Sequence, residues 1–120
     1  MRLLSLFVLV LFLGSCEAIN FADKANTKFA DQHFKTAIAQ IELYNKRYGH
    51  YPESLDSLTY LGDWDLMAIT AVKYERLDTG YNLDAAFGMV KGKPSNLNYP
   101  ADFWQGLGLK KSNLLSNNPQ

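Results

Sequence analysis

The chain has 120 residues, a length typical of one domain, and its twelve basic and twelve acidic residues balance. This balance argues against a basic face of the kind that binds nucleic acid, so we expect no nucleic-acid partner. One cysteine and two histidines are a poor supply for a metal or redox site, so we expect neither a metal nor a cofactor.

Residues 1–15 predict a targeting segment. Arg2 precedes an apolar run that continues to Leu13 and contains Ser5 as its one polar residue. The run is shorter than the roughly 20 residues that a helix needs to span a bilayer. It therefore indicates the core of a secretory signal peptide, which does not belong to the folded domain.

The end of this run, Leu13-Gly14-Ser15-Cys16, resembles the lipobox of bacterial lipoprotein signals. The resemblance implies that the Cys16 thiol receives a diacylglycerol, that the leader is cut just before Cys16, and that the new amine is acylated. A thiolate is the nucleophile that such a transfer needs, and two or three acyl chains give a stable anchor. The expected location is the bacterial cell envelope, lipid-anchored and facing the periplasm or the cell exterior.

Ordinary secretion is the alternative, because Cys16 and Ala18 are small residues that suit a signal-peptidase cut before Ile19. A retained membrane helix needs more apolar length than the run provides. In either case no cysteine follows residue 16, so we expect no intrachain disulfide.

The folded domain is expected over residues 21–109, after a short tether at 16–20. Apolar residues recur at steps of three and four and predict a helix from Phe21 to about Tyr48. Lysines alternate with this stripe, and Asp31 and Glu42 are expected with them on a solvated face. His33 lies beside the stripe and is interpreted as a structural residue.

After the helix, Tyr51–Leu58 predicts a short helical turn with Pro52 at its first position and with Leu55 and Leu58 facing inward. Residues 60–65 predict a loop or another turn, and residues 66–69 are ambiguous between helix and strand.

Two alternating segments, 71–77 and 81–87, predict an antiparallel hairpin around Asp78-Thr79-Gly80. A lone hairpin is marginal in water, so it must pack on the long helix. The prediction is an α+β fold with one long helix on a small antiparallel sheet. Residues 99–109 are the last expected ordered segment, and residues 110–120 are expected to be a polar tail.

The junction between helix and hairpin resembles the globular part of type IV pilins and of type II secretion major pseudopilins, over residues 29–87. The residues that carry the likeness are Tyr44, Gly49, Tyr51, Pro52, Leu55 and Leu58. Independently of the family, Gly49 permits the positive φ that ends a helix, Pro52 fixes the next element, and the Tyr44 and Tyr51 rings are expected to pack together. We assign this motif a structural role.

The chain departs from the pilin pattern in two places. Its apolar run precedes the processing site at Cys16, so the helix that assembles a pilus would be removed and polymerisation is not expected. Pro100–Gly106 echoes a pseudopilin segment, but it follows the hairpin and carries an extra residue.

No arrangement of residues predicts an enzyme. The serines lack a G-x-S-x-G context, His33 and His50 lack metal-ligand spacing, and Asp63 and Asp65 lack a calcium-loop pattern. Trp64 and Trp104 are the candidate partner contacts, because tryptophan is enriched at interaction hot spots. Each could instead close one end of the core.

The leading hypothesis is a non-enzymatic, lipid-anchored envelope protein that acts as an interaction module. Its partner would belong to secretion or pilus machinery, an inference from fold analogy. A small secreted or tethered inhibitor, or an immunity-type protein that blocks a toxin or hydrolase, is the alternative. A third hypothesis is an enzyme or a ligand-binding lipoprotein.

Overall fold

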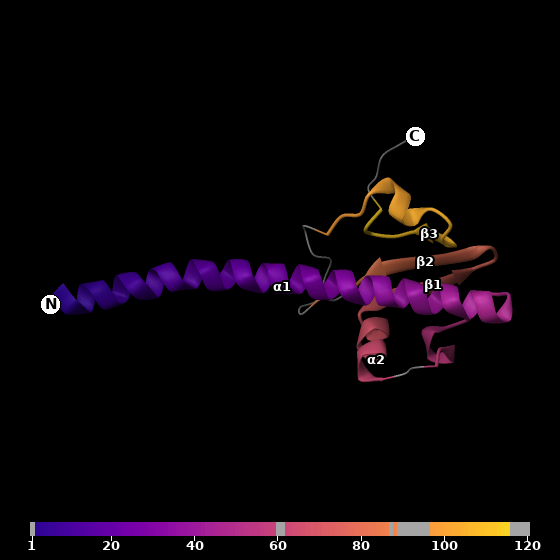
Figure 1. Cartoon of the computed structure of the whole chain (residues 1–120), viewed down its shortest axis with the longest axis horizontal. Coiled ribbons are helices and arrows are strands. Elements are labelled where there is room, and N and C mark those ends of the chain that lie inside the picture. Colours follow the sequence, from indigo (N-terminus) through magenta and orange to yellow (C-terminus); the bar gives the residue numbers. More distant parts are fainter. Residues whose placement is uncertain (1, 60–61, 87, 89–96, 116–120) are drawn as a thin grey trace.

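A computed structural model of the chain describes residues 2–59, 62–86, 88 and 97–115. Within the first helix, side chains are described at Leu3, Leu4 and Val8 and from Phe21 onward. The elements follow the order α1, η1, α2, β1, β2, η2 and β3. Figure 1 shows a helix that enters the domain from the left and continues along its whole length.

Helix α1 spans Arg2–Tyr48 and is continuous. It therefore begins well before Phe21, the expected start, and its backbone is helical through the expected signal and tether. Only its C-terminal part packs in the domain, beginning at Ala30 with 1% of its surface exposed. None of the helices, as far as their residues are described, combines the length and apolarity needed to cross a membrane.

The C-terminal end of α1 is closed as its sequence predicts. Gly49 has φ +78°, and its N–H donates a 2.8 Å hydrogen bond to the Asn45 carbonyl. This is the single-bond glycine cap that satisfies one of the free carbonyls at a helix end. Lys46 and Arg47 in the last turn add favourable charge to the negative end of the helix dipole.

The helical turn after Gly49 is shorter than predicted. It is the 3₁₀ turn η1 (Leu55–Ser57), so Pro52 does not occupy its first position. Pro52 is instead buried, and its carbonyl accepts a 2.6 Å hydrogen bond from the Tyr74 hydroxyl. Leu55 is half-buried and Leu58 buried, which confirms that both face inward.

Helix α2 (Asp63–Thr70) resolves the ambiguous stretch in favour of a helix. The predicted hairpin is present as β1 (Val72–Leu77) and β2 (Gly80–Ala85), paired antiparallel from Val72↔Ala85 to Leu77↔Gly80. Tyr81, Leu83 and Ala85 alternate inward on β2, as predicted. Phe87, predicted at the end of this strand, lies outside the described residues.

The C-terminal region differs from the prediction. After the turn η2 (Ala101–Trp104), strand β3 (Leu109–Lys111) pairs with β2 in parallel, so the sheet is mixed, in the order β1-β2-β3. Leu114 is 2% exposed. Residues 110–115 therefore belong to the domain rather than to a polar tail, and the sequence missed them because three residues are too few for a periodic pattern.

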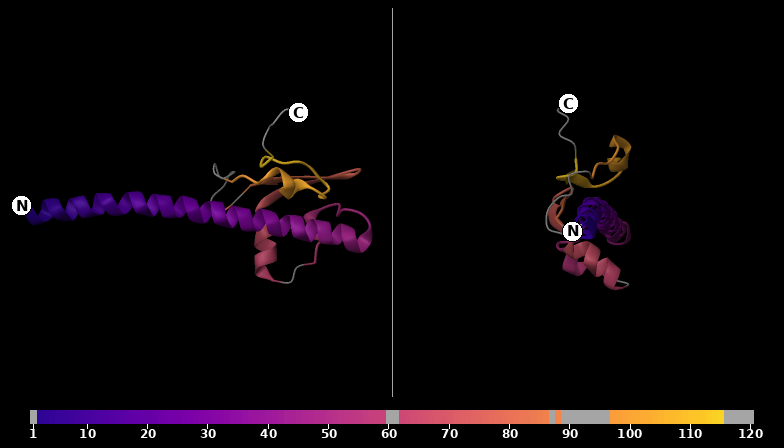
Figure 2. Two further views of the ribbon diagram at one scale, coloured as in Figure 1. Left: turned by 45° about the horizontal axis from the view of Figure 1, so that its top comes forward. Right: turned by 90° about the vertical axis from the view of Figure 1, so that its left-hand side faces the viewer.

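The α+β prediction is confirmed: α1 packs against a small sheet, with the core between them. Phe34, Ile41, Tyr81, Leu83 and Leu114 are its largest fully buried side chains, together with Pro52. The right-hand view of Figure 2 looks along α1 from its N-terminus. In that view α2 and the segment of η2 and β3 lie on opposite sides of α1, with the sheet beside it.

Candidate functional site

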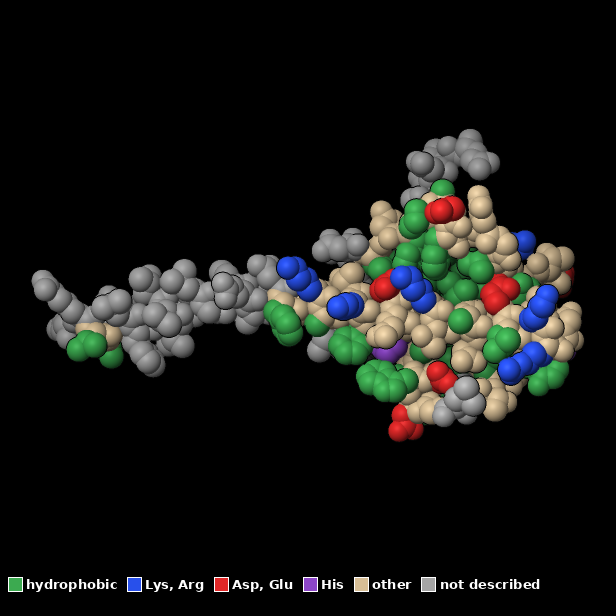
Figure 3. Space-filling view, in the orientation of Figure 1, with side chains coloured by type: hydrophobic (Ala, Val, Ile, Leu, Met, Phe, Trp, Pro, Cys, Tyr) green, Lys and Arg blue, Asp and Glu red, His purple; other side chains and the backbone are tan. Residues whose placement is uncertain are grey.

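The exposed side of α2 is the strongest candidate surface for a partner. Trp64 is 65% exposed, Leu66 49% and Met67 47%, while Ala68 and Ile69, the next two residues of the helix, are buried. Over α2, Figure 3 shows hydrophobic side chains next to acidic ones. Large exposed apolar side chains that share one short helix are typical of protein-interaction surfaces.

Acidic residues border this surface. Asp63 and Asp65 occupy the first turn of α2, where their negative charge favours the helix through its dipole. The α2 face, which we define as Asp63, Trp64, Leu66 and Met67, thus combines an apolar centre with a negative edge. A partner that fits it would present an apolar pocket with cations at its margin.

Trp104 lies elsewhere, in an aromatic cluster where the segment around η2 packs against Phe34 of α1. Its ring meets Phe103 at 5.0 Å, Tyr99 at 5.7 Å and Phe34 at 6.1 Å between centroids, each time edge to face. Such geometry is favourable for aromatic pairs. The structure therefore does not bring the two tryptophans together. Trp64 is exposed and available to a partner, whereas Trp104 packs against the core, which was the alternative considered for it.

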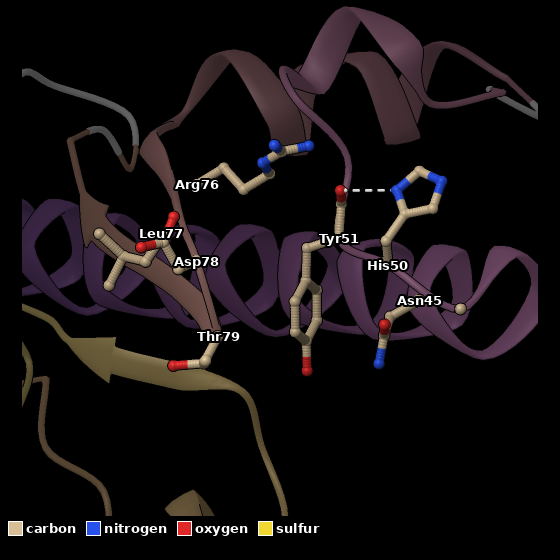
Figure 4. A pocket seen from close by; sticks show the side chains of 8 residues that line it. Asn45, His50, Tyr51, Arg76, Leu77, Asp78 and Thr79 are labelled. Atoms are coloured by element: carbon tan, nitrogen blue, oxygen red, sulfur yellow. Dashed lines mark hydrogen bonds between the residues drawn. The ribbon is translucent and has the colours of Figure 1, made fainter.

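A second feature is a pocket of about 360 Å³ between the end of α1 and the β1–β2 turn (Figure 4). In Figure 4, Leu77, Asp78 and Thr79 lie on one side of Tyr51, and Asn45 and His50 on the other. The His50 Nδ1–H donates to the Tyr51 carbonyl at 3.1 Å. Arg76 lies 3.6 Å from Glu53, an exposed ion pair.

The chemistry of this pocket is that of a polar binding surface. Its lining side chains offer amide, imidazole, hydroxyl, guanidinium and carboxylate groups, all of which can hydrogen-bond a polar partner. Across the described part of the chain, no group of three or more His, Cys, Asp and Glu side chains is placed to hold a metal ion.

Glu42 is the polar centre of the domain, and sequence reasoning missed it. Its carboxylate accepts three hydrogen bonds, from the Tyr51 hydroxyl at 3.1 Å, the Tyr81 hydroxyl at 2.9 Å and the Gly108 N–H at 2.8 Å. Burial, and then the negative charge of Glu42, raise the pKa of the Tyr81 hydroxyl, and the same two causes raise the pKa of Tyr51. Both tyrosines therefore remain protonated donors further into the alkaline range than an ordinary tyrosine.

Asp31, which precedes Glu42 on α1, also accepts a hydrogen bond from a tyrosine hydroxyl. It accepts a 2.8 Å hydrogen bond from the Tyr99 hydroxyl and lies 2.9 Å from the Lys35 ammonium. The expectation that Asp31 and Glu42 belong to a solvated face was therefore wrong. Helical periodicity places them beside lysines, and only the fold brings the tyrosines to them.

Among the other predicted residues, His33 is 6% exposed, and its ring lies 6.0 Å from that of Phe29. Burial lowers the pKa of His33, in keeping with a structural histidine. The rings of Tyr44 and Tyr51 take different partners: Tyr44 contacts Tyr48 at 4.6 Å, and Tyr51 contacts Tyr81 at 5.0 Å.

Cys16 lies on α1, and its side chain is outside the described ones. The lipidation prediction therefore stays a prediction. The chain matches no protein-family model, and neither the curated proteins nor the solved structures contain a match to it.

Proposed function

We propose that this protein is a lipid-anchored, non-enzymatic component of the bacterial cell envelope that binds another protein through the α2 face. The exposure of Trp64, Leu66 and Met67 is the observation that carries the interaction. An isolated domain gains nothing from exposing three large apolar side chains on an eight-residue helix, because their burial contributes to stability when they pack inward.

The lipobox at Leu13–Cys16 supports the anchor. In a chain cut before Cys16, α1 would run from the acylated residue directly into the domain. Ala30, the first buried core residue, would then lie about 20 Å along the helix from the anchor, at about 1.5 Å per residue. The helix would keep the α2 face near the membrane, within reach of a membrane-bound partner.

The resemblance around Tyr44–Pro52 supports a partner in secretion or pilus machinery. In this proposal the domain interacts with subunits of such machinery without polymerising, since cleavage before Cys16 removes the apolar N-terminal part of the helix. The α2 face would provide the contact. The Glu42 cluster, which we define as Glu42, Tyr51, Tyr81 and Gly108, would keep the domain rigid behind it.

The anchor is tested by the intact mass of the protein purified from membranes of its own host. We expect a chain that starts at Cys16 and carries two or three acyl chains. Cys16→Ser is the control, and it should accumulate without acylation. An unmodified chain that starts near Ile19 would refute the anchor.

The interaction is tested by placing a photo-crosslinking residue at Leu66 in the membrane-bound protein, with Leu43 as the matched control. Leu43 is also exposed but lies on α1. We expect crosslinks from position 66 to a secretion or pilus subunit, their loss in Trp64→Ala, and reduced secretion in that variant. Crosslinks from position 66 to a single toxin or hydrolase, with secretion unchanged, would indicate an inhibitor instead.

A further inference from the structure

The stretch of α1 that follows Cys16 carries an amphipathic surface, and this surface faces away from the domain. We call it the stalk face, and a shallow pocket of about 330 Å³ lies along it. Its lining residues are spaced by three and four positions, which places them on one side of the helix. They are Phe21, Lys24, Ala25, Lys28, Phe29 and Gln32.

The stalk face is opposite to the core-facing side of the same helix. At about 100° of rotation per residue, Phe21 and Lys28 point away from Ala30 and Phe34, which are buried. Figure 3 shows Lys or Arg side chains next to hydrophobic ones on the stretch of α1 that leads into the domain. On this face Phe21, Lys24, Lys28 and Gln32 are exposed, and Ala25 and Phe29 are half-buried.

The charge of the stalk face is positive. Lys24 and Lys28 are exposed, and neither forms an ion pair with any residue that the structure describes. Of the nearby acidic residues whose side chains the structure describes, Asp31 is held by Lys35 and the Tyr99 hydroxyl. Asp23 lies about 100° around the helix from Lys24. Phe21, at 75% exposure, adds a large apolar ring beside the two cations.

Phe21 and the two lysines lie close enough to Cys16 along α1 to reach the surface of a membrane in which Cys16 is anchored. Phe21 follows Cys16 by five residues, or about 8 Å of helix, and Lys28 by twelve residues, or about 18 Å. A basic helical face with an aromatic residue is the pattern that binds at the interface of an anionic bilayer, where headgroup phosphates attract lysine and the ring enters the interface.

We propose that the stalk face lies against anionic phospholipid, with Lys24 and Lys28 at headgroup phosphates and Phe21 in the interface. This inference rests on the proposed anchor at Cys16, which supplies the proximity. In this arrangement α1 is tilted toward the membrane and the domain sits on the opposite side of the helix. The orientation of the α2 face is then set by lipid charge as well as by the anchor.

A fluorescent probe near the lysines tests the proposal in the lipidated protein. Because the acyl chain blocks the Cys16 thiol, Ala25→Cys supplies one free thiol for an environment-sensitive dye. The protein is reconstituted into vesicles of phosphatidylcholine alone or mixed with phosphatidylglycerol. We expect a blue shift, and quenching by brominated lipid, in the anionic vesicles. Thr79→Cys, at the distant β1–β2 turn, should show neither.

Charge variants give the second comparison. Lys24→Gln with Lys28→Gln should lower the ratio of surface-bound to free stalk by about fivefold per lysine. High salt should have the same effect, because the screening length falls to about 3 Å at 1 M. Lys110→Gln with Lys111→Gln removes the same charge from exposed positions on β3 and should leave the probe signal unchanged.

Three results would overturn the proposal: a position-25 probe that stays in water in anionic vesicles, a shift of equal size in pure phosphatidylcholine, or a shift that follows the protein-to-lipid ratio and so reports a second copy of the chain. The intact mass of the same preparation separates the two ideas. Acylated protein with a water-exposed probe refutes the stalk face alone, whereas protein without acyl chains refutes the anchor and the stalk face together.

Discussion

The Tyr81 hydroxyl on β2 donates a 2.9 Å hydrogen bond to the Glu42 carboxylate on α1, 39 positions earlier in the chain. Tyr81 is fully buried, and the same carboxylate also receives Tyr51 and the Gly108 N–H. One side chain thus joins the long helix to the turn after it, to the central strand and to the segment before β3. Gly108 allows this approach, since a Cβ there would overlap the Tyr51 hydroxyl.

Glu42→Gln should lower the free energy of unfolding by about 1–3 kcal/mol, because an amide replaces one of the carboxylate oxygens and weakens charge-assisted hydrogen bonds to partly buried donors. Urea unfolding followed by circular dichroism measures the change. Glu53→Gln is the control, since the Glu53 side chain is 83% exposed and should change stability little. Equal effects of the two substitutions would show that the Glu42 cluster does not hold the domain together.

Stability should fall at alkaline pH because of the buried tyrosines. Burial raises the pKa of Tyr74 to about 12 from the ordinary tyrosine value of 10.0. The folded protein therefore keeps this proton while the unfolded chain loses it. The contribution is fully present below pH 10 and is lost as pH rises toward about 12, with a slope of about 1.4 kcal/mol per pH unit for one proton.

Tyr74→Phe should reduce that alkaline slope by about one proton, and urea unfolding at a series of pH values above 10 measures it. Near neutral pH the same variant should be less stable by about 1 kcal/mol, because the Pro52 carbonyl loses its 2.6 Å hydrogen bond. Identical slopes for the two proteins would contradict the assigned burial of this hydroxyl.

Asn113→Ala should destabilise the domain by about 2 kcal/mol. The Asn113 side chain accepts a hydrogen bond from the Ala85 N–H at 2.9 Å and donates one to the Ala85 carbonyl at 2.8 Å, so it takes the place of a strand neighbour. Thermal unfolding of this variant and of the exposed control Asn98→Ala provides the comparison. A neutral result at position 113 would mean that residues 112–115 add little to the fold.

The two tryptophans should respond differently to truncation. Trp104→Ala removes a half-buried ring from the cluster around Phe34 and should cost about 2 kcal/mol, less than a fully buried tryptophan. Trp64→Ala should change stability by less than about 0.5 kcal/mol, because its ring is 65% exposed. Urea unfolding of both variants measures this, and a large loss at position 64 would remove the α2 face as a free surface.

The sequence by itself determined the local features of this protein. The three-and-four spacing gave the packed part of α1, Gly49 gave its end, and the alternation through Tyr81, Leu83 and Ala85 gave the strand next to the core. These follow from backbone geometry and from burial of one face, both of which depend on residues close together in the chain.

Only the tertiary structure decided the long-range features. They include the parallel pairing of β3 with β2, the contacts of Asn113 with Ala85, and the burial of Leu114. These features depend on segments more than twenty residues apart, and no local sequence pattern indicates them. The roles of Asp31 and Glu42 were decided in the same way, because a carboxylate on a helix is a solvated charge until the fold brings tyrosine hydroxyls to it. The separation of Trp64 from Trp104 also depends on which side of α1 each segment packs against.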